Sequence, residues 1–162
     1  MENIKKILKL VTLLGCAVVH FVHLESQDIH LSCSMLKSSV TKTEQPTVQL
    51  PMVVVSCSYN NAPWAEKSLD SIFMQKYDNF RVIYVDDASE DGTADIVERY
   101  IERHNLRDRI TLIKNTHRRR KMHNIYNVYH TCEDHEIIVQ LDGDDWFAHD
   151  QVLADLNQEY LN

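Results

Sequence analysis

The sequence predicts an α/β fold with a mostly parallel sheet flanked by helices. Apolar runs typical of strands alternate with stretches of helical periodicity from Met52 onward. The run Met52–Cys57 is rich in β-branched residues and does not alternate with polar ones, as expected for a strand covered on both faces. Polar clusters follow several of these runs. In an open parallel sheet, ligands bind outside the carboxyl ends of the strands, so a ligand site is expected along that edge.

Composition limits the possible classes of protein. With 162 residues, 44% of them hydrophobic, the chain has room for one ordinary domain and an appendage. A formal net charge of −7 argues against a nucleic-acid partner. The four cysteines are widely spaced and form no C-x-x-C pair, so neither a zinc site nor a disulfide framework is indicated.

The N-terminal region resembles a targeting segment. In residues 1–24 three lysines precede an apolar run, which is the layout of a signal peptide or signal-anchor. Membrane attachment through residues 7–24, or export, is expected; if the segment is instead a buried or amphipathic helix, the protein is expected in the cytoplasm. Residues 25–50 are rich in Ser, Thr, Gln and Lys and predict a polar linker. The folded domain is expected at residues 51–162.

The first half of this domain predicts two strand and helix pairs. Pro63 suits the first turn of a helix that extends to about Lys76, with apolar residues at helical spacing. A second strand is expected at 80–85. The turn at Asp91-Gly92 then leads to a helix with one apolar face. The apolar positions of the two helices are Ala65, Leu69, Ile72 and Phe73, and Ile96, Val97, Tyr100 and Ile101.

The second half repeats the alternation. A short strand at 110–113 precedes the basic patch His117–Lys121, which is either a solvated face or a phosphate contact. A helix at 122–131 and a strand at 137–141 follow, and 151–161 can form one last helix.

The strand at 137–141 ends in three closely spaced acids, Asp142, Asp144 and Asp145. Carboxylates this close repel one another, so a folded protein keeps them together mainly when a cation or a hydrogen-bonding ligand offsets the repulsion. Hard oxygen ligands suit Mg²⁺ or Mn²⁺, which usually bind one or two carboxylates together with substrate phosphates. The pattern therefore predicts a site for a metal and a diphosphate.

Two further polar clusters follow earlier strands. Ser58-Tyr59-Asn60 comes after the first strand and Asp86-Asp87 after the second. A tyrosine ring offers an aromatic face and a carboxylate accepts hydrogen bonds from N–H groups, so together they could hold a planar base.

These motifs, in this order, resemble the nucleotide-sugar half of a family 2 glycosyltransferase with the GT-A (Rossmann-like) fold. The resemblance runs from Met52 to about Asp150 and is carried by Ser58-Tyr59-Asn60, by Val85–Thr93 and by Leu141–Asp145. It implies that the chain transfers a sugar from a nucleotide diphosphate sugar, UDP-linked by preference, to an unknown acceptor, with Mn²⁺ or Mg²⁺ as cofactor.

The resemblance also implies roles for individual residues. Tyr59 would pack on the base and Asp87 would hydrogen-bond to it. The late acids would form the Asp-x-Asp motif, with Asp142 and Asp144 on the ribose and diphosphate side and Asp144 or Asp145 as the direct metal ligand. The implied nucleotide-binding residues are Ser58, Tyr59, Asn60, Asp87, Arg118, Arg120, Asp142 and Asp144, and the implied metal ligands are Asp144 and Asp145.

The sequence departs from the family pattern in two places. Many relatives carry an Ala-Arg-Asn motif before the last strand, where this chain has Ile125-Tyr126-Asn127; an arginine at 118–120 is the expected replacement as a phosphate clamp. Relatives also continue into an acceptor-binding half with the catalytic base, whereas this sequence ends at Asn162. The expectation is a domain truncated after the Asp-x-Asp strand, with no catalytic residue identified.

Two other functions are compatible with parts of this sequence. One is a non-catalytic module that binds nucleotide sugars. The other, less favoured, is a receiver-type phosphoacceptor signalling domain. In receivers the acidic pair follows the first strand, whereas here a complete strand and helix precede Asp86.

Overall fold

The structure is a computed structural model that describes residues 11–12 and 48–162. The predicted targeting segment and linker lie outside the described residues, apart from 11–12 and 48–50, so membrane attachment through residues 7–24 stays a prediction. Among the described residues, no helix combines the length and the apolar character needed to cross a membrane.

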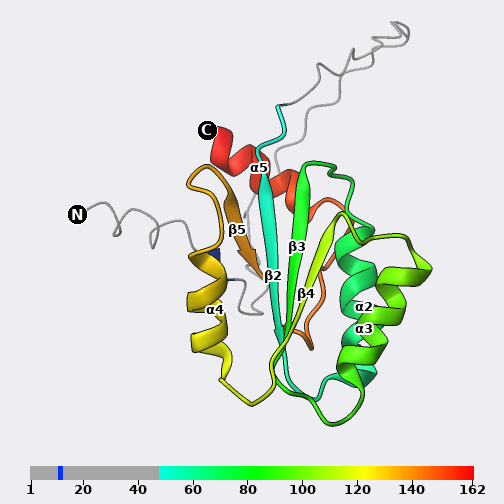
Figure 1. The fold of residues 1–162 in the computed structure, drawn as a ribbon. Coiled ribbons are helices and arrows are strands. Elements are labelled where there is room, and N and C mark those ends of the chain that lie inside the picture. Colours follow the sequence, from blue (N-terminus) through cyan, green and yellow to red (C-terminus); the bar gives the residue numbers. More distant parts are fainter. Residues whose placement is uncertain (1–10, 13–47) are drawn as a thin grey trace, which may run out of the picture. The chain divides into compact units, whose positions relative to one another are not determined.

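The predicted alternation of strands and helices is confirmed (Figure 1). Most element boundaries lie within two residues of those predicted. The helix predicted to reach Lys76 ends earlier, at Phe73, because the chain turns there and the Lys76 N–H donates to the Asp150 carbonyl at 2.7 Å. The elements are β1 (Val11–Thr12), β2 (Met52–Ser58), α2 (Ala62–Phe73), β3 (Phe80–Asp86), α3 (Thr93–Arg103), β4 (Ile110–Lys114), α4 (Lys121–Tyr129), β5 (Ile137–Gln140) and α5 (Val152–Leu161).

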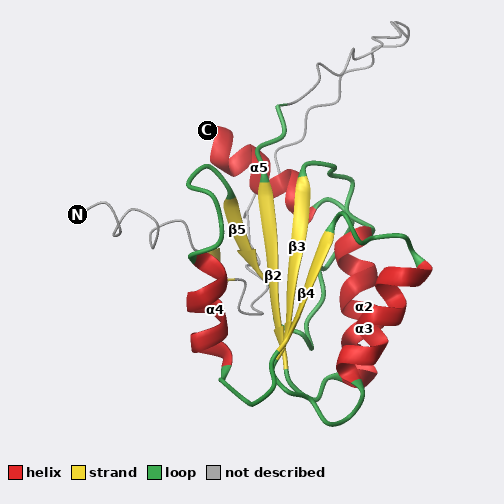
Figure 2. Cartoon of the chain, in the orientation of Figure 1, coloured by secondary structure: helices red, strands yellow, loops and turns green. Residues whose placement is uncertain are grey.

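The strands form one parallel sheet in the order β1-β5-β2-β3-β4 (Figure 2). The chain adds β3 and β4 on one side of β2 and then returns to place β5 on the other side. The strand order therefore reverses between β2 and β5. In open α/β sheets this switch point is where loops diverge and ligands bind.

Both faces of the sheet are buried over β2, β3 and β5, as the continuous apolar strands predicted, whereas most of β4 is exposed. Alternate strand residues such as Val54 and Tyr84 contribute to a large core that includes side chains of α2, α3 and α5. The intervening residues, such as Val53 and Ile83, form a smaller core with Val128 of α4. The period of two along each strand thus divides the apolar side chains between the two faces.

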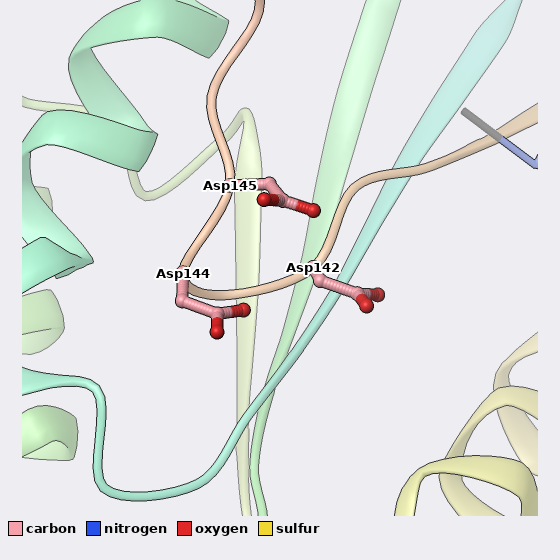
Figure 3. A group of neighbouring side chains, drawn as sticks. All are labelled: Asp142, Asp144 and Asp145. Atoms are coloured by element: carbon pink, nitrogen blue, oxygen red, sulfur yellow. The ribbon is translucent and has the colours of Figure 1, made fainter. Parts of the chain in front are cut away.

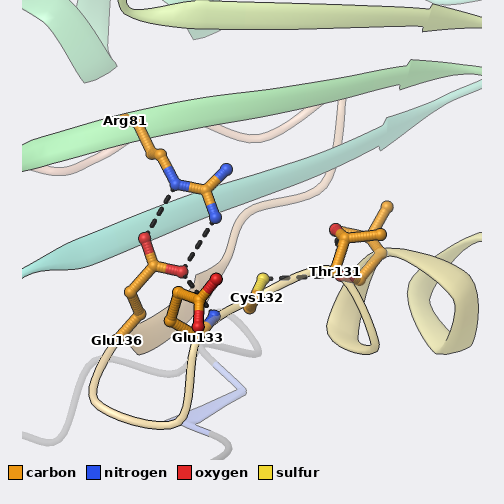
Figure 4. Close-up of polar contacts among 6 residues, drawn as sticks. Arg81, Thr131, Cys132, Glu133 and Glu136 are labelled. Carbon is orange, nitrogen blue, oxygen red and sulfur yellow. Dashed lines mark hydrogen bonds and ion pairs between the residues drawn. The ribbon is translucent and has the colours of Figure 1, made fainter.

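An ion pair links β3 to the residue before β5 across β2, at the amino end of the sheet. The Arg81 guanidinium donates from Nε and Nη2 to the two carboxylate oxygens of Glu136, each at 2.8 Å, and the Glu133 N–H donates to the same carboxylate (Figure 4). The Glu136 side chain is only 10% exposed. Hydrogen bonds from Arg81 lower the pKa of Glu136, with burial opposing them to a smaller extent. This pair fixes the relative positions of three strands.

We expect Glu136→Gln to lower the free energy of unfolding by about 1–3 kcal/mol, because it removes a charged, two-fold hydrogen bond in a mostly buried position. Urea denaturation measures this. The matched control is Glu102→Gln, which breaks the exposed Arg107–Glu102 pair and should cost no more than about 0.5 kcal/mol. Equal losses of unfolding free energy in the two variants would show that the Arg81–Glu136 pair stabilises the fold no more than an exposed ion pair does.

Candidate functional site

The polar clusters predicted to share one edge of the sheet do meet there. Ser58 and Asp86 are paired across β2 and β3 as the last residues of the two strands. The Asp87 N–H donates to the Ser58 carbonyl at 2.8 Å, and the Leu141 N–H donates to the Val55 carbonyl at 3.0 Å. Parallel register therefore brings the ends of β2, β3 and β5 together.

Gly143 holds the acidic turn against the end of β2. Its N–H donates to the Cys57 carbonyl at 3.2 Å. A Cβ atom at this position would lie 2.6 Å from the Ser58 Cβ and 2.7 Å from the Ser58 Oγ, which is too close for any side chain. Glycine is required here because its backbone lies directly against the Ser58 side chain.

The three acids that flank Gly143 form a compact cluster. One carboxylate oxygen each from Asp142, Asp144 and Asp145 lie within 4.8 Å of one another, arranged around the turn after β5 (Figure 3). Asp144 and Asp145 are exposed and Asp142 is half-buried. Burial raises the pKa of Asp145, and the charges of Asp144 and Asp142 raise it further. The donor set is entirely hard oxygen, which fits a divalent cation such as Mg²⁺ or Mn²⁺.

A cavity of about 360 Å³ opens beside the ends of β2 and β3. It contains one aromatic ring, one carboxylate and three cationic side chains, a combination that suits a planar group carrying phosphates. The residues that line it are Cys57, Ser58, Tyr59, Asp87, Arg118, Arg120, Lys121 and Asn124.

Asp87 anchors the basic segment, residues 117–121, to this cavity. Its carboxylate accepts hydrogen bonds from the Arg119 and Arg120 N–H groups, at 2.8 and 2.7 Å, and from the Asn115 Nδ2 at 2.8 Å. Burial raises the pKa of Asp87, but the nearby Asn124 amide and these hydrogen bonds outweigh it and lower the pKa to about 2. The carboxylate is thus held ionised at the centre of the site.

Arg118 lies against Tyr59. The guanidinium carbon is 3.8 Å from the centroid of the tyrosine ring, a cation–π contact. Tyr59 is half-buried and Arg118 exposed. One face of the ring predicted to carry a base is therefore in contact with one of the arginines predicted to bind phosphate.

Comparison with a family model shows which protein family this chain belongs to. Residues 53–159 match the model of glycosyl transferase family 2. The chain belongs to this family. Its parallel sheet flanked by helices is the GT-A fold, as predicted, and the membership argues against the receiver alternative.

Similar proteins support the same assignment. EpsE of Bacillus subtilis (strain 168), which carries a glycosyltransferase name, is 35% identical over 101 residues, covering 62% of this chain and 34% of EpsE. The mannosyltransferase PcManGT from Pyrobaculum calidifontis, solved in complex with GDP-Man and Mn²⁺, is 36% identical with a TM-score of 0.58, over 64% of this chain and 30% of that one. TarS 1–349 of S. aureus, solved with UDP-GlcNAc, is 25% identical with a TM-score of 0.55, over 66% of this chain and 30% of that one. The chain spans about a third of the length of these relatives.

The predicted site residues of this family 2 domain do not all occupy the cavity. Ser58, Tyr59, Asp87, Arg118 and Arg120 line it, whereas the acidic cluster lies beside it and is joined to it through Lys121.

Asn60, also predicted to bind nucleotide, does not line the cavity, and its role stays a prediction. It is exposed, its Oδ1 accepts from the Glu90 N–H at 3.0 Å, and its own N–H donates to the Ser89 Oγ at 2.9 Å. With a positive φ of 54°, it turns the chain and ties the loop after β2 to the loop after β3.

Sequence reasoning missed three residues of the site. Asn115 and Asn124 were not singled out because isolated amides carry no motif, whereas Lys121 was included as the last residue of the basic patch His117–Lys121. Cys57 lines the cavity, and burial followed by the charge of Asp142 raises its pKa to about 12, so it remains a neutral thiol.

We expect Asp87→Asn to remove roughly 2 kcal/mol of stability at neutral pH, because an amide puts an N–H against the backbone donors of Arg119 and Arg120. The native pKa lies below the ordinary 3.8, so the contribution is fully present above about pH 4 and is lost as the pH falls toward 2. Urea denaturation of both proteins from pH 7 to pH 2 tests this. A stability difference that stays constant with pH would contradict it.

Proposed function

We propose that this domain binds a nucleotide diphosphate sugar, UDP-linked by preference, through Mn²⁺ or Mg²⁺, and serves as the donor-binding part of a glycosyltransferase. The observation that carries the proposal is the cluster of three carboxylates beside a cavity that combines an aromatic ring with cationic side chains. The complexes of similar proteins with GDP-Man and Mn²⁺ and with UDP-GlcNAc support it.

The acidic cluster would hold the metal. Asp144 and Asp145 are the exposed members, and Asp142 is engaged by Lys121 and by the Gln140 amide. We therefore assign direct metal contact to Asp144 and Asp145. When bound, the metal supplies Lewis-acid stabilisation for the charge of a departing diphosphate.

The cavity would hold the nucleotide. A base can stack on Tyr59 once Arg118 moves from the ring, which frees that guanidinium for phosphate. Asp87 already accepts three hydrogen bonds, and a carboxylate offers about four acceptor positions, so room remains for one N–H of the base. Uracil and guanine both present such an N–H beside a carbonyl.

A second function, binding of a nucleotide sugar without transfer, would use the same cavity and acidic cluster. Both functions predict donor binding. Only release of the nucleotide from UDP-GlcNAc or GDP-mannose, the ligands of the similar structures, separates them.

Thermal unfolding of the full chain with UDP, GDP or ADP, each with and without Mn²⁺, tests the donor site. A nucleotide at about a hundred times its dissociation constant should add roughly 2.7 kcal/mol, which raises Tm by several degrees. We expect the shift with UDP or GDP, only with Mn²⁺, and expect Asp144→Asn combined with Asp145→Asn to abolish it.

The control for that experiment is Asp108→Asn, which removes an exposed acid in the turn before β4, at the opposite edge of the sheet. It should keep the shift. No shift with any nucleotide in a protein that unfolds cooperatively would exclude the donor site.

A further inference from the structure

Lys121 connects the cavity to the acidic cluster. It is the first residue of α4 and lines the cavity, and its Nζ forms an ion pair with Asp142 Oδ2. Among the residues that the structure describes, no other cavity-lining side chain is bonded to the cluster. Lys121 is therefore placed to contact a ligand that spans both parts of the site.

The ammonium occupies a position that a metal ion would compete for. Asp142 Oδ1 accepts from the Gln140 Nε2 at 3.2 Å, and Oδ2 accepts from Lys121, so both oxygens are engaged. The three carboxylates of the cluster are thus partly neutralised by one lysine. A divalent cation that entered the cluster would repel this ammonium and weaken its hold on Asp142.

The backbone before Lys121 is fixed by hydrogen bonds, whereas its side chain is half-exposed and held by a single ion pair. Asp87 binds the N–H groups of Arg119 and Arg120, and Arg120 is held at φ 71° and ψ 153°, a conformation that non-glycine residues rarely adopt. No side chain caps α4, so its first-turn N–H groups add to the positive potential here. The Lys121 side chain, 46% exposed, is a point charge on a flexible stem.

We propose that Lys121 is a diphosphate-binding residue that leaves Asp142 when metal and nucleotide enter, and so couples the two binding events. This rests on the proposed function. With a divalent ion in the cluster, the lysine is no longer needed there as counter-ion, and a diphosphate beside the metal offers new negative charge. Lys121 should therefore weaken the binding of Mn²⁺ alone. It should strengthen the binding of a nucleoside diphosphate together with Mn²⁺.

Lys121→Met tests this, because methionine keeps the length and helix propensity and removes the charge. We expect Mn²⁺ to bind the nucleotide-free variant about tenfold more tightly than wild type, measured by electron paramagnetic resonance of free Mn²⁺. With saturating Mn²⁺, calorimetry should show UDP binding weakened about tenfold and UMP binding unchanged, since only UDP carries the second phosphate. GDP and GMP replace them if guanine nucleotides give the larger thermal shift.

The matched control is Lys76→Met, which breaks the surface pair Lys76–Asp150 and should behave as wild type. If wild type binds Mn²⁺ and UDP and Lys121→Met binds both equally well, the inference is wrong while the proposed function stands. Equal loss of UDP and UMP, or tighter Mn²⁺ binding with unaltered UDP binding, would also overturn the diphosphate role. Wild type that binds neither ligand would overturn the proposed function and this inference together.

Discussion

Strand β2 is hydrogen-bonded to a neighbour on each edge and covered on both faces, and this constraint determines where polar chemistry can lie. Its interior can accept almost only apolar side chains, because a polar group there would lack water and partners. Apart from the buried Ser56, polar residues therefore begin where the strand ends, at Ser58. Since β3 and β5 run parallel to β2 in fixed register, their own ends fall at the same edge. The site is a consequence of how the central strand is buried.

At the carboxyl edge of the sheet, the charged side chains of the site are paired with groups of the same chain. Asp87 is buried and ionised, and it binds backbone N–H groups of the basic segment instead of a side-chain cation. The cationic side chains of that segment are thereby left for other partners: Arg118 lies on Tyr59 and Lys121 on Asp142. Both partners are groups that a bound nucleotide and its metal would use. On the proposed function, ligand binding would exchange internal contacts for contacts of the same chemical kind, which would lower the cost of exposing unpaired charge.

Much of the fold was predictable because its signals are local. Continuous β-branched runs identified β2, β3 and β5, and apolar residues at helical spacing identified α2 and α3. The acidic cluster was predictable too, since its three members follow one strand and their repulsion demands compensation. The partners of Asp87 were not. Arg119 and Arg120 contribute backbone N–H groups, and nothing in a side-chain pattern reveals which backbone groups will be left to bond.

The sequence by itself determined the succession of strands and helices along the chain, the apolar residues of the core and the three polar clusters that mark a family 2 glycosyltransferase. Each of these depends on neighbouring residues. Only the tertiary structure decided which clusters touch. The return of β5 to the far side of β2 places Asp142 next to Lys121, a residue of the basic patch 21 positions earlier. It also requires glycine at 143, where the backbone lies directly against the Ser58 side chain. Such contacts depend on distances between segments far apart in the chain, which local spacing does not encode.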